Sequence, residues 1–325
     1  MTDYRIFIRS LGGPEVLERE PIDPSPPAAG EVRVRHTAIG LNFIDTYYRK
    51  GLYPMELPGS PGVEGAGVVE AIGEGVTGFR SGDRVAYVSK MPGSYATVRN
   101  LPAAELAILP DTISDEIGAA VMVKGLTTWA LAEPCSRLKA GQTALVHAAA
   151  GGVGSLLVQW LKAIGVTVIA HAGSAEKARR ATELGADHAL DLPFDSLAQA
   201  VRDLTGGRGV DAVFDGVGAA SWQATLASTA RRGLVASFGN ASGPVPPFTV
   251  RELTLAGSLF VTRPSLYDYM ADPAERRAGA ERLFALIAEG KLRIEINHRF
   301  ALTDAASAHR ALEGRQTTGS TILIP

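Results

Sequence analysis

The 325-residue chain has one cysteine, few aromatic residues and no marked excess of charge of either sign. A single cysteine, Cys135, excludes an intramolecular disulfide and any zinc site built from several cysteines. Lysine and arginine number 32, and aspartate and glutamate number 34, which leaves a formal net charge of −2. This balance disfavours proteins that bind nucleic acids or anionic membranes, because these usually carry an excess of basic residues.

The sequence also lacks an apolar run of the roughly 18 residues that a membrane-spanning helix needs. Residues 1–10 carry charges and no apolar signal core. Hydrophobic residues make up 46% of the chain and charged residues 20%, which excludes intrinsic disorder. We therefore expect a globular, cytoplasmic protein with about two domains, since a domain takes roughly 150 residues.

Two parts of the chain differ in their secondary-structure pattern. Up to about residue 123, short runs between turns predict strands of a barrel or sandwich. From about residue 115 helical periodicity begins, and strands and helices then alternate, which predicts a parallel sheet with helices on both faces. The predicted strands are 31–39, 63–72, 82–88, 93–98, 143–147, 166–170, 188–190, 210–215, 234–238, 255–261 and 321–324. The predicted helices are 117–123, 126–131, 155–164, 175–184, 273–289 and a last one with Thr303 as N-cap and Gly314 past its end.

A glycine-rich stretch, Ala148-Ala-Ala-Gly-Gly-Val-Gly154, lies between a predicted strand and a predicted helix. It matches the dinucleotide-binding fingerprint with Ala149 in place of the first glycine. Gly151 would let the backbone approach a pyrophosphate, and Gly154 would let helix and strand pack closely. The free N–H groups of the helix start would bind that phosphate. We predict a dinucleotide site here; a tight turn without a ligand is the alternative interpretation.

The end of the second strand of this pattern favours NADPH over NADH. An NAD site usually has an acidic residue there for the ribose 2′-hydroxyl, but the chain has His171-Ala-Gly-Ser174. Gly173, Ser174 and Lys177 offer a small loop, a hydroxyl and a cation, which suit a 2′-phosphate. We interpret Arg179 and Arg180 as part of a solvated helix face.

Several motifs stand in order along the whole chain. They are Asn42-Phe-Ile-Asp-Thr-Tyr47, Gly51-Leu-Tyr-Pro54, Gly62-Val-Glu-Gly-Ala-Gly67, Lys124-Gly-Leu-Thr127, His147-Ala-Ala-Ala-Gly-Gly-Val-Gly154, Ser237-Phe-Gly-Asn240, Val261-Thr-Arg-Pro264 and the final Gly319-Ser-Thr-Ile-Leu-Ile-Pro325. Together they resemble the NADPH-dependent quinone oxidoreductases of the zinc-independent medium-chain dehydrogenase/reductase superfamily, the group that includes ζ-crystallin.

This resemblance implies an α/β fold in which a Rossmann domain, a doubly wound parallel sheet, is inserted in a GroES-like, partly open β-barrel domain. We expect residues 1–123 and 265–325 in the GroES-like catalytic domain and residues 124–264 in the Rossmann domain, with NADPH in the cleft between them. The resemblance also implies a homodimer that pairs through the edge strand of the Rossmann sheet, near Ser258–Val261. The apolar composition of this edge fits, because an unpaired apolar edge invites aggregation.

The resemblance further implies the residues of the site. Tyr47, Tyr53 and Arg263 are candidates to line the substrate, although Tyr47 and Tyr53 could instead shape or pack the pocket and Arg263 could lie at a surface or interface. Leu192 stands where close relatives carry a tyrosine near the adenosine phosphate, so we expect a weaker preference for NADPH. The residues implied for NADPH are Asn42, Thr127, Gly151, Gly152, Val153, Gly154, Gly173, Ser174, Lys177, Phe238, Gly239, Asn240, Val261, Thr262 and Arg315.

Zinc-dependent relatives bind the catalytic metal with a cysteine and with the histidine of a Gly-His-Glu motif. Here that motif is Gly62-Val63-Glu64, and no cysteine lies in the first 134 residues. We therefore expect no metal and a structural role for Glu64. We expect a structural role for His147 as well.

Without a metal, the substrate must be an intrinsically good electron acceptor. A quinone qualifies, because its reduction yields an aromatic hydroquinone anion. We therefore expect NADPH:quinone oxidoreduction by hydride or single-electron transfer. One alternative is reduction of another activated alkene, an enone or an enoyl thioester. A non-catalytic crystallin-like or RNA-binding role is a further alternative, which the nucleotide fingerprint and the net charge disfavour.

Overall fold

The computed structural model describes residues 2–314 and 316–325, so the predicted cofactor residue Arg315 lies outside the described residues. The chain divides into two compact units. Unit 1 comprises Met1–Leu126, Pro273–Ala288 and Arg293–Pro325, and unit 2 comprises Thr127–Asp272 and Glu289–Leu292. In the part of the chain that the structure describes, no helix combines the length and apolarity needed to cross a membrane.

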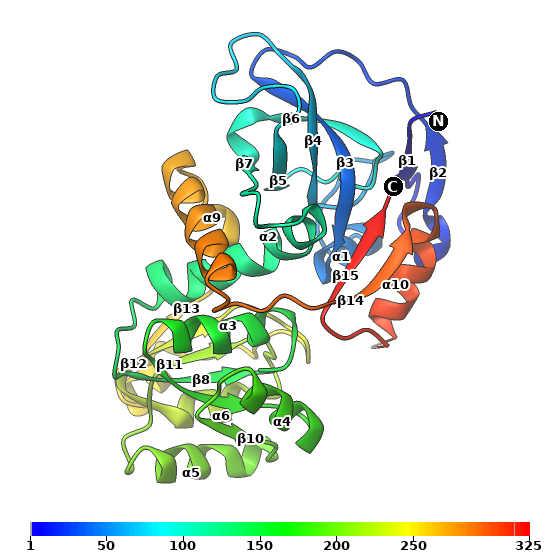
Figure 1. Cartoon of the computed structure of the whole chain (residues 1–325). Coiled ribbons are helices and arrows are strands. Elements are labelled where there is room, and N and C mark those ends of the chain that lie inside the picture. Colours follow the sequence, from blue (N-terminus) through cyan, green and yellow to red (C-terminus); the bar gives the residue numbers. More distant parts are fainter. Residues whose placement is uncertain (1, 315) are drawn as a thin grey trace. The chain divides into compact units, whose positions relative to one another are not determined.

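Unit 1 is built around one long strand, β3 (Glu31–Leu41), which pairs with β4 and β6 along its first part and with β15 at its end. The sheet has the order β14-β15-β3-β4-β5-β7, with β6 on β3, and only β14 and β15 are parallel (Figure 1). A separate antiparallel pair is formed by β1 and β2. The strands are β1 (Tyr4–Phe7), β2 (Glu18–Pro21), β4 (Glu64–Ile72), β5 (Arg84–Val88), β6 (Val98–Pro102), β7 (Leu106–Ile108), β14 (Ile296–Ala301) and β15 (Ser320–Ile324). The helices are α1 (Phe43–Lys50), α2 (Asp115–Ala130), α9 (Pro273–Ala288) and α10 (Ala305–Glu313), and α2 contains the boundary with unit 2.

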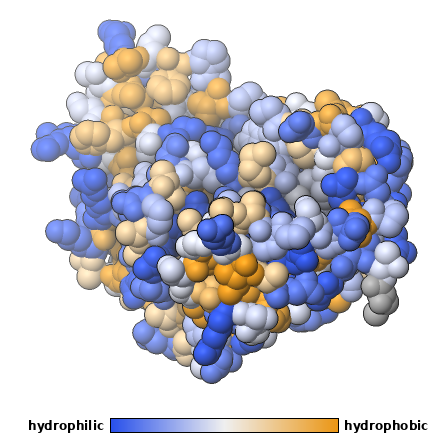
Figure 2. Space-filling view, turned by 90° about the horizontal axis from the view of Figure 1, so that it is seen from above, coloured by the Kyte–Doolittle hydropathy of each residue, from blue (hydrophilic) through white to orange (hydrophobic). Residues whose placement is uncertain are grey.

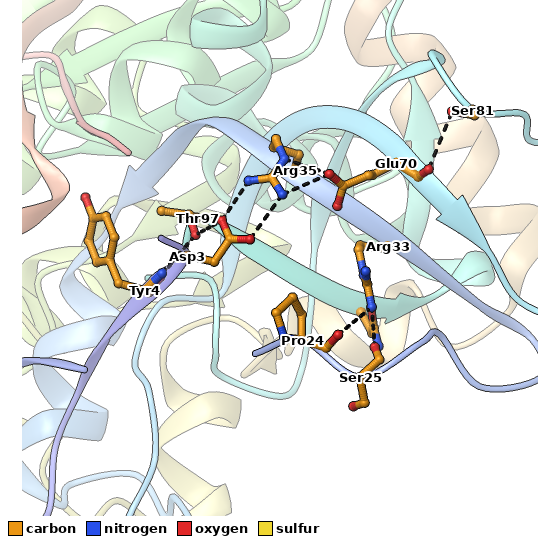
Figure 3. Close-up of polar contacts among 10 residues, drawn as sticks. Asp3, Tyr4, Pro24, Ser25, Arg33, Arg35, Glu70, Ser81 and Thr97 are labelled. Atoms are coloured by element: carbon orange, nitrogen blue, oxygen red, sulfur yellow. Dashed lines mark hydrogen bonds and ion pairs between the residues drawn. The ribbon is translucent and has the colours of Figure 1, made fainter. Parts of the chain in front are cut away.

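The alternation expected for residues 31–39 is present in β3. Val32, Val34, His36 and Ala38 are buried, whereas the arginines between them point away from the core. Figure 3 shows the hydrogen bonds and ion pairs that Arg33 and Arg35 make. The guanidinium of Arg35 donates to Asp3 Oδ1 at 2.7 Å and to Glu70 Oε1 at 2.9 Å, and Arg33 Nη2 donates to the carbonyl of Pro24 at 2.9 Å. The outer face of β3 therefore fixes the N-terminal segment and the proline-rich loop.

Unit 2 contains a six-stranded sheet whose paired strands are all parallel, as the βαβ pattern predicts. Its order is β10-β9-β8-β11-β12-β13 (Figure 1). Counted from β8, this is 3-2-1-4-5-6, the doubly wound order, which reverses direction between β8 and β11 and places a ligand crevice at the carboxyl ends of the strands. The strands are β8 (Thr143–His147), β9 (Thr167–His171), β10 (His188–Leu190), β11 (Val210–Asp215), β12 (Thr229–Ser237) and β13 (Phe260–Thr262). The helices are α3 (Gly152–Ala163), α4 (Ala175–Glu183), α5 (Phe194–Leu204), α6 (Trp222–Ser228), α7 (Val250–Leu255) and α8 (Leu266–Tyr269).

One predicted strand of unit 2 is largely wrong. Residues 255–261 do not form a continuous strand: α7 ends at Leu255 and β13 begins only at Phe260. Leu255 belongs to α7, which begins with a capping box in which the backbone N–H of Thr249 donates to Glu252 Oε1 at 2.8 Å. After this helix the chain turns, with Gly257 and Ser258 at positive φ, and it becomes extended only at Phe260.

Three smaller predictions also need correction. The strand expected at 93–98 lies further along, as β6, because residues before Val98 turn and make only an isolated bridge at Ala96. The helices expected at 117–123 and 126–131 are one continuous helix, α2. The last helix has Asp304 rather than Thr303 as N-cap, since a 3-10 turn, Leu302–Asp304, precedes it.

Each unit has its own apolar core. In unit 1 one cluster includes Val34, Val85 and Tyr87, and in unit 2 another includes Leu145 and Val213. On the face drawn in Figure 2, hydrophobic side chains lie in separate patches among hydrophilic ones. Isolated exposed apolar residues are normal for a globular protein, so only local groups of them call for an explanation.

Candidate active site

In the turn after β8, the start of helix α3 packs closely against the backbone of the turn. A Cβ on Gly154 would lie 2.3 Å from the carbonyl oxygen of Ala148, so only glycine lets α3 pack this close to the turn. Gly151 is the N-cap of α3, Gly152 is its first residue, and both are exposed, while Val153 is half-buried. The first N–H groups of a helix have no partner within it, so this turn offers donors and a partial positive charge to an anion.

The loop after β9 is open and carries a cation. A Cβ on Gly173 would meet no atom within 4 Å, and Ser174 caps α4 by accepting the Lys177 N–H at 3.3 Å. The Lys177 side chain is exposed and, among the described residues, has no ion-pair partner. Arg179 and Arg180 instead pair with Glu183 at 2.5 and 3.2 Å, which fits their interpretation as a solvated helix face.

A chain of buried polar groups lies at the carboxyl ends of β8, β9 and β11. His171 Nε2 is 2.9 Å from the carbonyl of Leu192, its Nδ1 is 3.2 Å from His147 Nδ1, and His147 Nε2 is 2.9 Å from the Thr225 hydroxyl. Thr225 in turn donates to Asp215 Oδ2 at 2.7 Å. Burial lowers the pKa of His147 to about 4, opposed by Asp215, and burial also lowers the pKa of His171. These contacts give His147 the structural surroundings that the sequence predicted.

The loops after β11 and β12 are held against each other. A Cβ on Gly239 would lie 2.4 Å from the carbonyl oxygen of Gly216. A Cβ on Gly216 would lie 2.9 Å from the ring of Phe238, so neither glycine leaves room for a side chain. Arg263 Nη1 donates to the Gly239 carbonyl at 3.1 Å and to Asn240 Oδ1 at 3.2 Å. Arg263 therefore fixes this loop. Three further predicted residues of unit 2 are half-buried: Thr127 in α2, and Val261 and Thr262 in β13.

In unit 1, the predicted site residues gather around α1, a helix that the sequence analysis missed. Its N-cap is Asn42, whose backbone N–H donates to Asp45 Oδ2 at 2.8 Å. After the helix, the chain folds back, so that the Tyr53 ring lies edge-on 5.5 Å from the Tyr47 ring and 5.9 Å from the Tyr48 ring. The structure thus brings Tyr47 and Tyr53 together beside the exposed side chain of Leu52.

Beneath α1, a cluster of ionisable groups lies inside unit 1. Glu64 is fully buried and accepts from Asn42 Nδ2 at 2.5 Å and from the Val123 N–H at 2.7 Å. A Cβ on Gly40 would lie 2.3 Å from Glu64 Oε2, so the glycine makes room for the carboxylate. Burial raises the pKa of Glu64, opposed mainly by Lys124, and burial lowers the pKa of Lys124. The structural role predicted for Glu64 is therefore specific: it orients the carboxamide of Asn42.

Asp45 joins this cluster to a second buried chain. Burial raises the pKa of Asp45 to about 7, and its Oδ1 atom has no hydrogen-bond partner. Its Oδ2 accepts from the Tyr95 hydroxyl at 3.2 Å, and Tyr95 lies 2.9 Å from His309 Nε2. Arg49 Nη1 donates to His309 Nδ1 at 2.8 Å. Because arginine can only donate, His309 carries its proton on Nε2 and donates to Tyr95.

Sequence reasoning missed the roles of Asp45, Tyr95 and His309. The available signal was a charged residue within a mostly apolar segment, such as Asp45 after Phe43 and Ile44. In the part of the chain that the structure describes, no three His, Cys, Asp or Glu side chains are placed to hold a metal ion. The absence of a catalytic metal stays a prediction.

Comparisons with known proteins agree with the two units. Residues 28–111 match the alcohol dehydrogenase GroES-like domain family, and residues 152–275 match the zinc-binding dehydrogenase family. These matches and the sheet order confirm the expected fold class, a Rossmann-type sheet with a GroES-like domain.

Three relatives match along essentially the whole chain. A quinone oxidoreductase of Pseudomonas aeruginosa is 51% identical over 322 residues, covering 99% of both chains. A 2-haloacrylate reductase of a Burkholderia species is 39% identical over 98% of both chains. The crystal structure of Escherichia coli quinone oxidoreductase complexed with NADPH has a TM-score of 0.94 at 42% identity, covering 99% of this chain and 100% of that one. The chain belongs to the quinone oxidoreductase family of the medium-chain dehydrogenase/reductase superfamily.

Proposed function

We propose that this chain is an NADPH-dependent quinone oxidoreductase that acts without zinc. The observation that carries the proposal is the pair of loops at the carboxyl ends of β8 and β9. The first places the exposed residues Gly151 and Gly152 at the start of α3, and the second combines an open loop, which has no acidic residue at 171–174, with the exposed Lys177. Full-length similarity to quinone oxidoreductases supports the same activity.

The residues present fit an NADPH molecule. The start of α3, at Gly151 to Gly154, would hold the pyrophosphate, because the first N–H groups of a helix have no partner within it and Gly154 leaves no room for a side chain. Gly173, Ser174 and Lys177 would hold the 2′-phosphate. The remaining residues that we assign to the cofactor are Asn42, Thr127, Phe238, Gly239, Asn240, Val261, Thr262 and Arg315.

NADPH supplies the reducing equivalents, and the chain's own residues position the acceptor and stabilise charge on it. We assign Tyr47 and Tyr53 to the quinone, because their rings offer an apolar surface and their hydroxyls can donate to a developing oxyanion. Glu64 holds Nδ2 of Asn42, so that the carboxamide keeps one orientation. We also retain Arg263 as a residue that could line the substrate, because it shapes the loop at Gly239.

The test is the oxidation of NADPH by purified, metal-stripped protein with 1,4-benzoquinone, followed at 340 nm with NADH in parallel. We expect fast turnover that chelators do not affect and that favours NADPH. Tight NADPH binding without turnover of quinones would contradict the substrate assignment. Equal use of NADH would contradict the cofactor assignment, and would fit the loss of the tyrosine that Leu192 replaces.

A second candidate function is reduction of another activated alkene. The observation that favours it is the 2-haloacrylate reductase, which is 39% identical and matches 98% of this chain. Both reactions deliver reducing equivalents to an electron-poor double bond conjugated to a carbonyl group. Turnover of 2-chloroacrylate or an enone at a higher kcat/KM than benzoquinone would make this candidate the better one.

We also propose that the chain forms a homodimer through β13, the edge of the unit 2 sheet. Phe260 on β13 is 62% exposed, and Val250 (80%) and Leu255 (70%) are exposed on α7, the helix that precedes β13 in the chain. An exposed apolar edge usually marks an interface or an aggregation site.

A single cysteine fits a reducing compartment, so we include a cytoplasmic location in the proposal.

A further inference from the structure

The buried polar chain of unit 2 has one hydrogen too few. Four contacts link the Leu192 carbonyl, His171, His147, Thr225 and Asp215, and each of them needs one hydrogen. Two neutral histidines and one threonine hydroxyl supply three hydrogens, and an ionised aspartate supplies none. One contact is therefore left with two facing lone pairs, unless the chain takes up a further proton.

The direction of the hydrogen bonds can be traced from Asp215. This buried side chain accepts from the N–H groups of Val217 and Gly218 at 2.8 and 3.1 Å and from the Ser221 hydroxyl at 2.7 Å, which is the pattern of a carboxylate. The Thr225 hydroxyl therefore also donates to Asp215, and it accepts from His147 Nε2. His147 Nδ1 is then an acceptor, so its hydrogen must come from His171 Nδ1.

The missing hydrogen falls on His171. With its Nδ1 donating to His147, a neutral His171 would turn the lone pair of Nε2 toward the Leu192 carbonyl, 2.9 Å away. Only an imidazolium satisfies both contacts. The ring is nearly inaccessible, at 5% exposure, and the Phe194 ring lies 4.9 Å from it, so water has little room to relieve the conflict.

Burial and the nearby carboxylates have opposite effects on the protonation of His171. Burial disfavours the imidazolium, whereas Asp215 and Asp191 favour it. The loop that begins two residues after His171, at Gly173, Ser174 and Lys177, is the loop that we assign to the 2′-phosphate. A phosphate dianion there adds negative charge on the same edge of the sheet, because β9 ends at His171.

We propose that His171 takes up a proton when a 2′-phosphorylated nucleotide binds, so that NADPH affinity in this protein is linked to proton uptake at a buried histidine pair. The inference rests on the proposed NADPH site. It makes His171 a positioning residue: its imidazolium ties the loop after β9 to the turn after β8 and to Leu192. It also assigns a compensating interaction to a chain that has Leu192 in place of a phosphate-binding tyrosine.

The experiment is isothermal titration of the full-length protein with NADP⁺ at pH 7.5, in buffers of different ionisation enthalpy such as HEPES and Tris. The buffer dependence of the binding enthalpy gives the number of protons taken up. We expect a net uptake approaching one proton with NADP⁺ and none with NAD⁺, which lacks the 2′-phosphate. Affinity for NADP⁺ should then fall with rising pH by up to about tenfold per unit more than affinity for NAD⁺.

Thr225→Val tests the inference directly, because it removes the contacts of Thr225 with His147 and with Asp215, two of the four in the chain. His147 can then place its hydrogen on Nδ1, and two neutral histidines satisfy both remaining contacts. We expect this variant to bind NADP⁺ without the proton uptake, although His171 is intact. His188→Gln, at an exposed histidine of β10, is the matched control and should keep the uptake.

A second readout does not depend on any variant. In ¹⁵N-labelled protein, both ring nitrogens of His171 should show the imidazolium shift in the NADP⁺ complex and not in the free protein. Binding of NADP⁺ without proton uptake, or an uptake that Thr225→Val keeps, would overturn this inference and leave the proposed function intact. Failure of NADP⁺ to bind would instead overturn the cofactor assignment on which the inference rests.

Discussion

Asn42 and Glu64 form a buried hydrogen bond in which the carboxamide Nδ2 donates to the carboxylate Oε2 at 2.5 Å. The two residues are 22 positions apart, at the end of β3 and at the start of β4. A carboxylate can only accept, so this bond decides which end of the Asn42 amide is available to a ligand. The bond therefore connects a buried charge to the orientation of a predicted site residue.

Glu64→Gln tests this connection with almost no change in size. Glutamine can offer its NH₂ group where Glu64 accepts, so Asn42 loses its fixed orientation and the Val123 N–H competes for one remaining oxygen. We expect a loss of about 1–3 kcal/mol in the free energy of unfolding, since buried donors lose their acceptor. The kcat/KM for benzoquinone should fall about tenfold, measured by NADPH oxidation.

The matched control is Glu18→Gln, which removes an exposed carboxylate 3.7 Å from Arg9 in the same unit. Exposed ion pairs contribute little, so stability should change by less than about 0.5 kcal/mol. A Glu64→Gln protein with unchanged kinetics would show that the orientation of Asn42 does not matter for turnover.

Asp45 should make the protein less stable as pH rises from acid to neutral. Burial raises its pKa to about 7 from the ordinary aspartate value of 3.8, so the unfolded chain releases this proton at a lower pH than the folded one. The contribution of Asp45 is fully present below about pH 4 and is lost as pH rises through about 7. Asp45→Asn mimics the protonated form, so its stability relative to the original chain should increase over this window by about 1.4 kcal/mol per pH unit.

The measurement is urea unfolding of both proteins at several pH values between 4 and 8. Asp83→Asn is the matched control, because the Arg80 N–H lowers the pKa of Asp83 below its usual value. Asp83 therefore titrates below this pH window in both the folded and the unfolded chain, so the stability difference for Asp83→Asn should stay constant from about pH 5 to 8. A pH-independent difference for Asp45→Asn would contradict a raised pKa at this carboxyl.

The site in unit 2 could be predicted from sequence, whereas the site in unit 1 could only be placed by resemblance. The turn at Gly151 to Gly154 is local: strand, glycines and helix stand together within a dozen residues, and each has its own pattern. The contacts of Glu64 join β4 to Asn42 and to Val123, 22 and 59 positions away. No periodicity reports such pairs, because they depend on how the strands of the barrel pair.

Two of the helices that sequence reasoning missed, α1 and α7, have a different explanation. Both are short, eight residues in α1 and six in α7, and both begin with a reciprocal cap, at Asn42 and Thr249. The caps are visible in the sequence as Asn42-x-x-Asp45 and Thr249-x-x-Glu252. Neither segment is long enough to show a clear helical periodicity, so the cap was the one local signal for each helix.

Gly154→Ala should damage both the fold and nucleotide binding. Alanine normally favours a helix, but here its Cβ would lie 2.3 Å from a backbone oxygen, that of Ala148, which cannot move away alone. We expect about 1–3 kcal/mol of destabilisation, seen as a lower Tm, and weaker binding of NADPH. Gly173→Ala is the matched comparison for stability, because its Cβ meets nothing within 4 Å and Tm should stay the same.

Lys177→Gln should reduce the preference for NADPH over NADH. A charge-assisted hydrogen bond to the 2′-phosphate contributes about 1.5–3 kcal/mol, so KM for NADPH should rise about 10- to 100-fold while KM for NADH stays constant. The control is Arg179→Gln on the same helix, whose guanidinium is engaged by Glu183 at 2.5 Å. Parallel increases for both nucleotides would place Lys177 outside the 2′-phosphate site.

Phe260→Glu should separate the proposed dimer into monomers. Phe260 lies on β13, the last strand in the order of the unit 2 sheet, and its side chain is 62% exposed. A carboxylate placed there would have to be buried in a two-fold interface opposite its own copy, and burying like charges is strongly unfavourable. Light scattering after gel filtration should therefore give half the mass found for the original chain.

Leu204→Glu, at the end of α5 and 41% exposed, is the control and should leave the mass unchanged. A monomeric original chain at micromolar concentration would remove the dimer from the proposal and would leave β13 as an edge protected only by its short length.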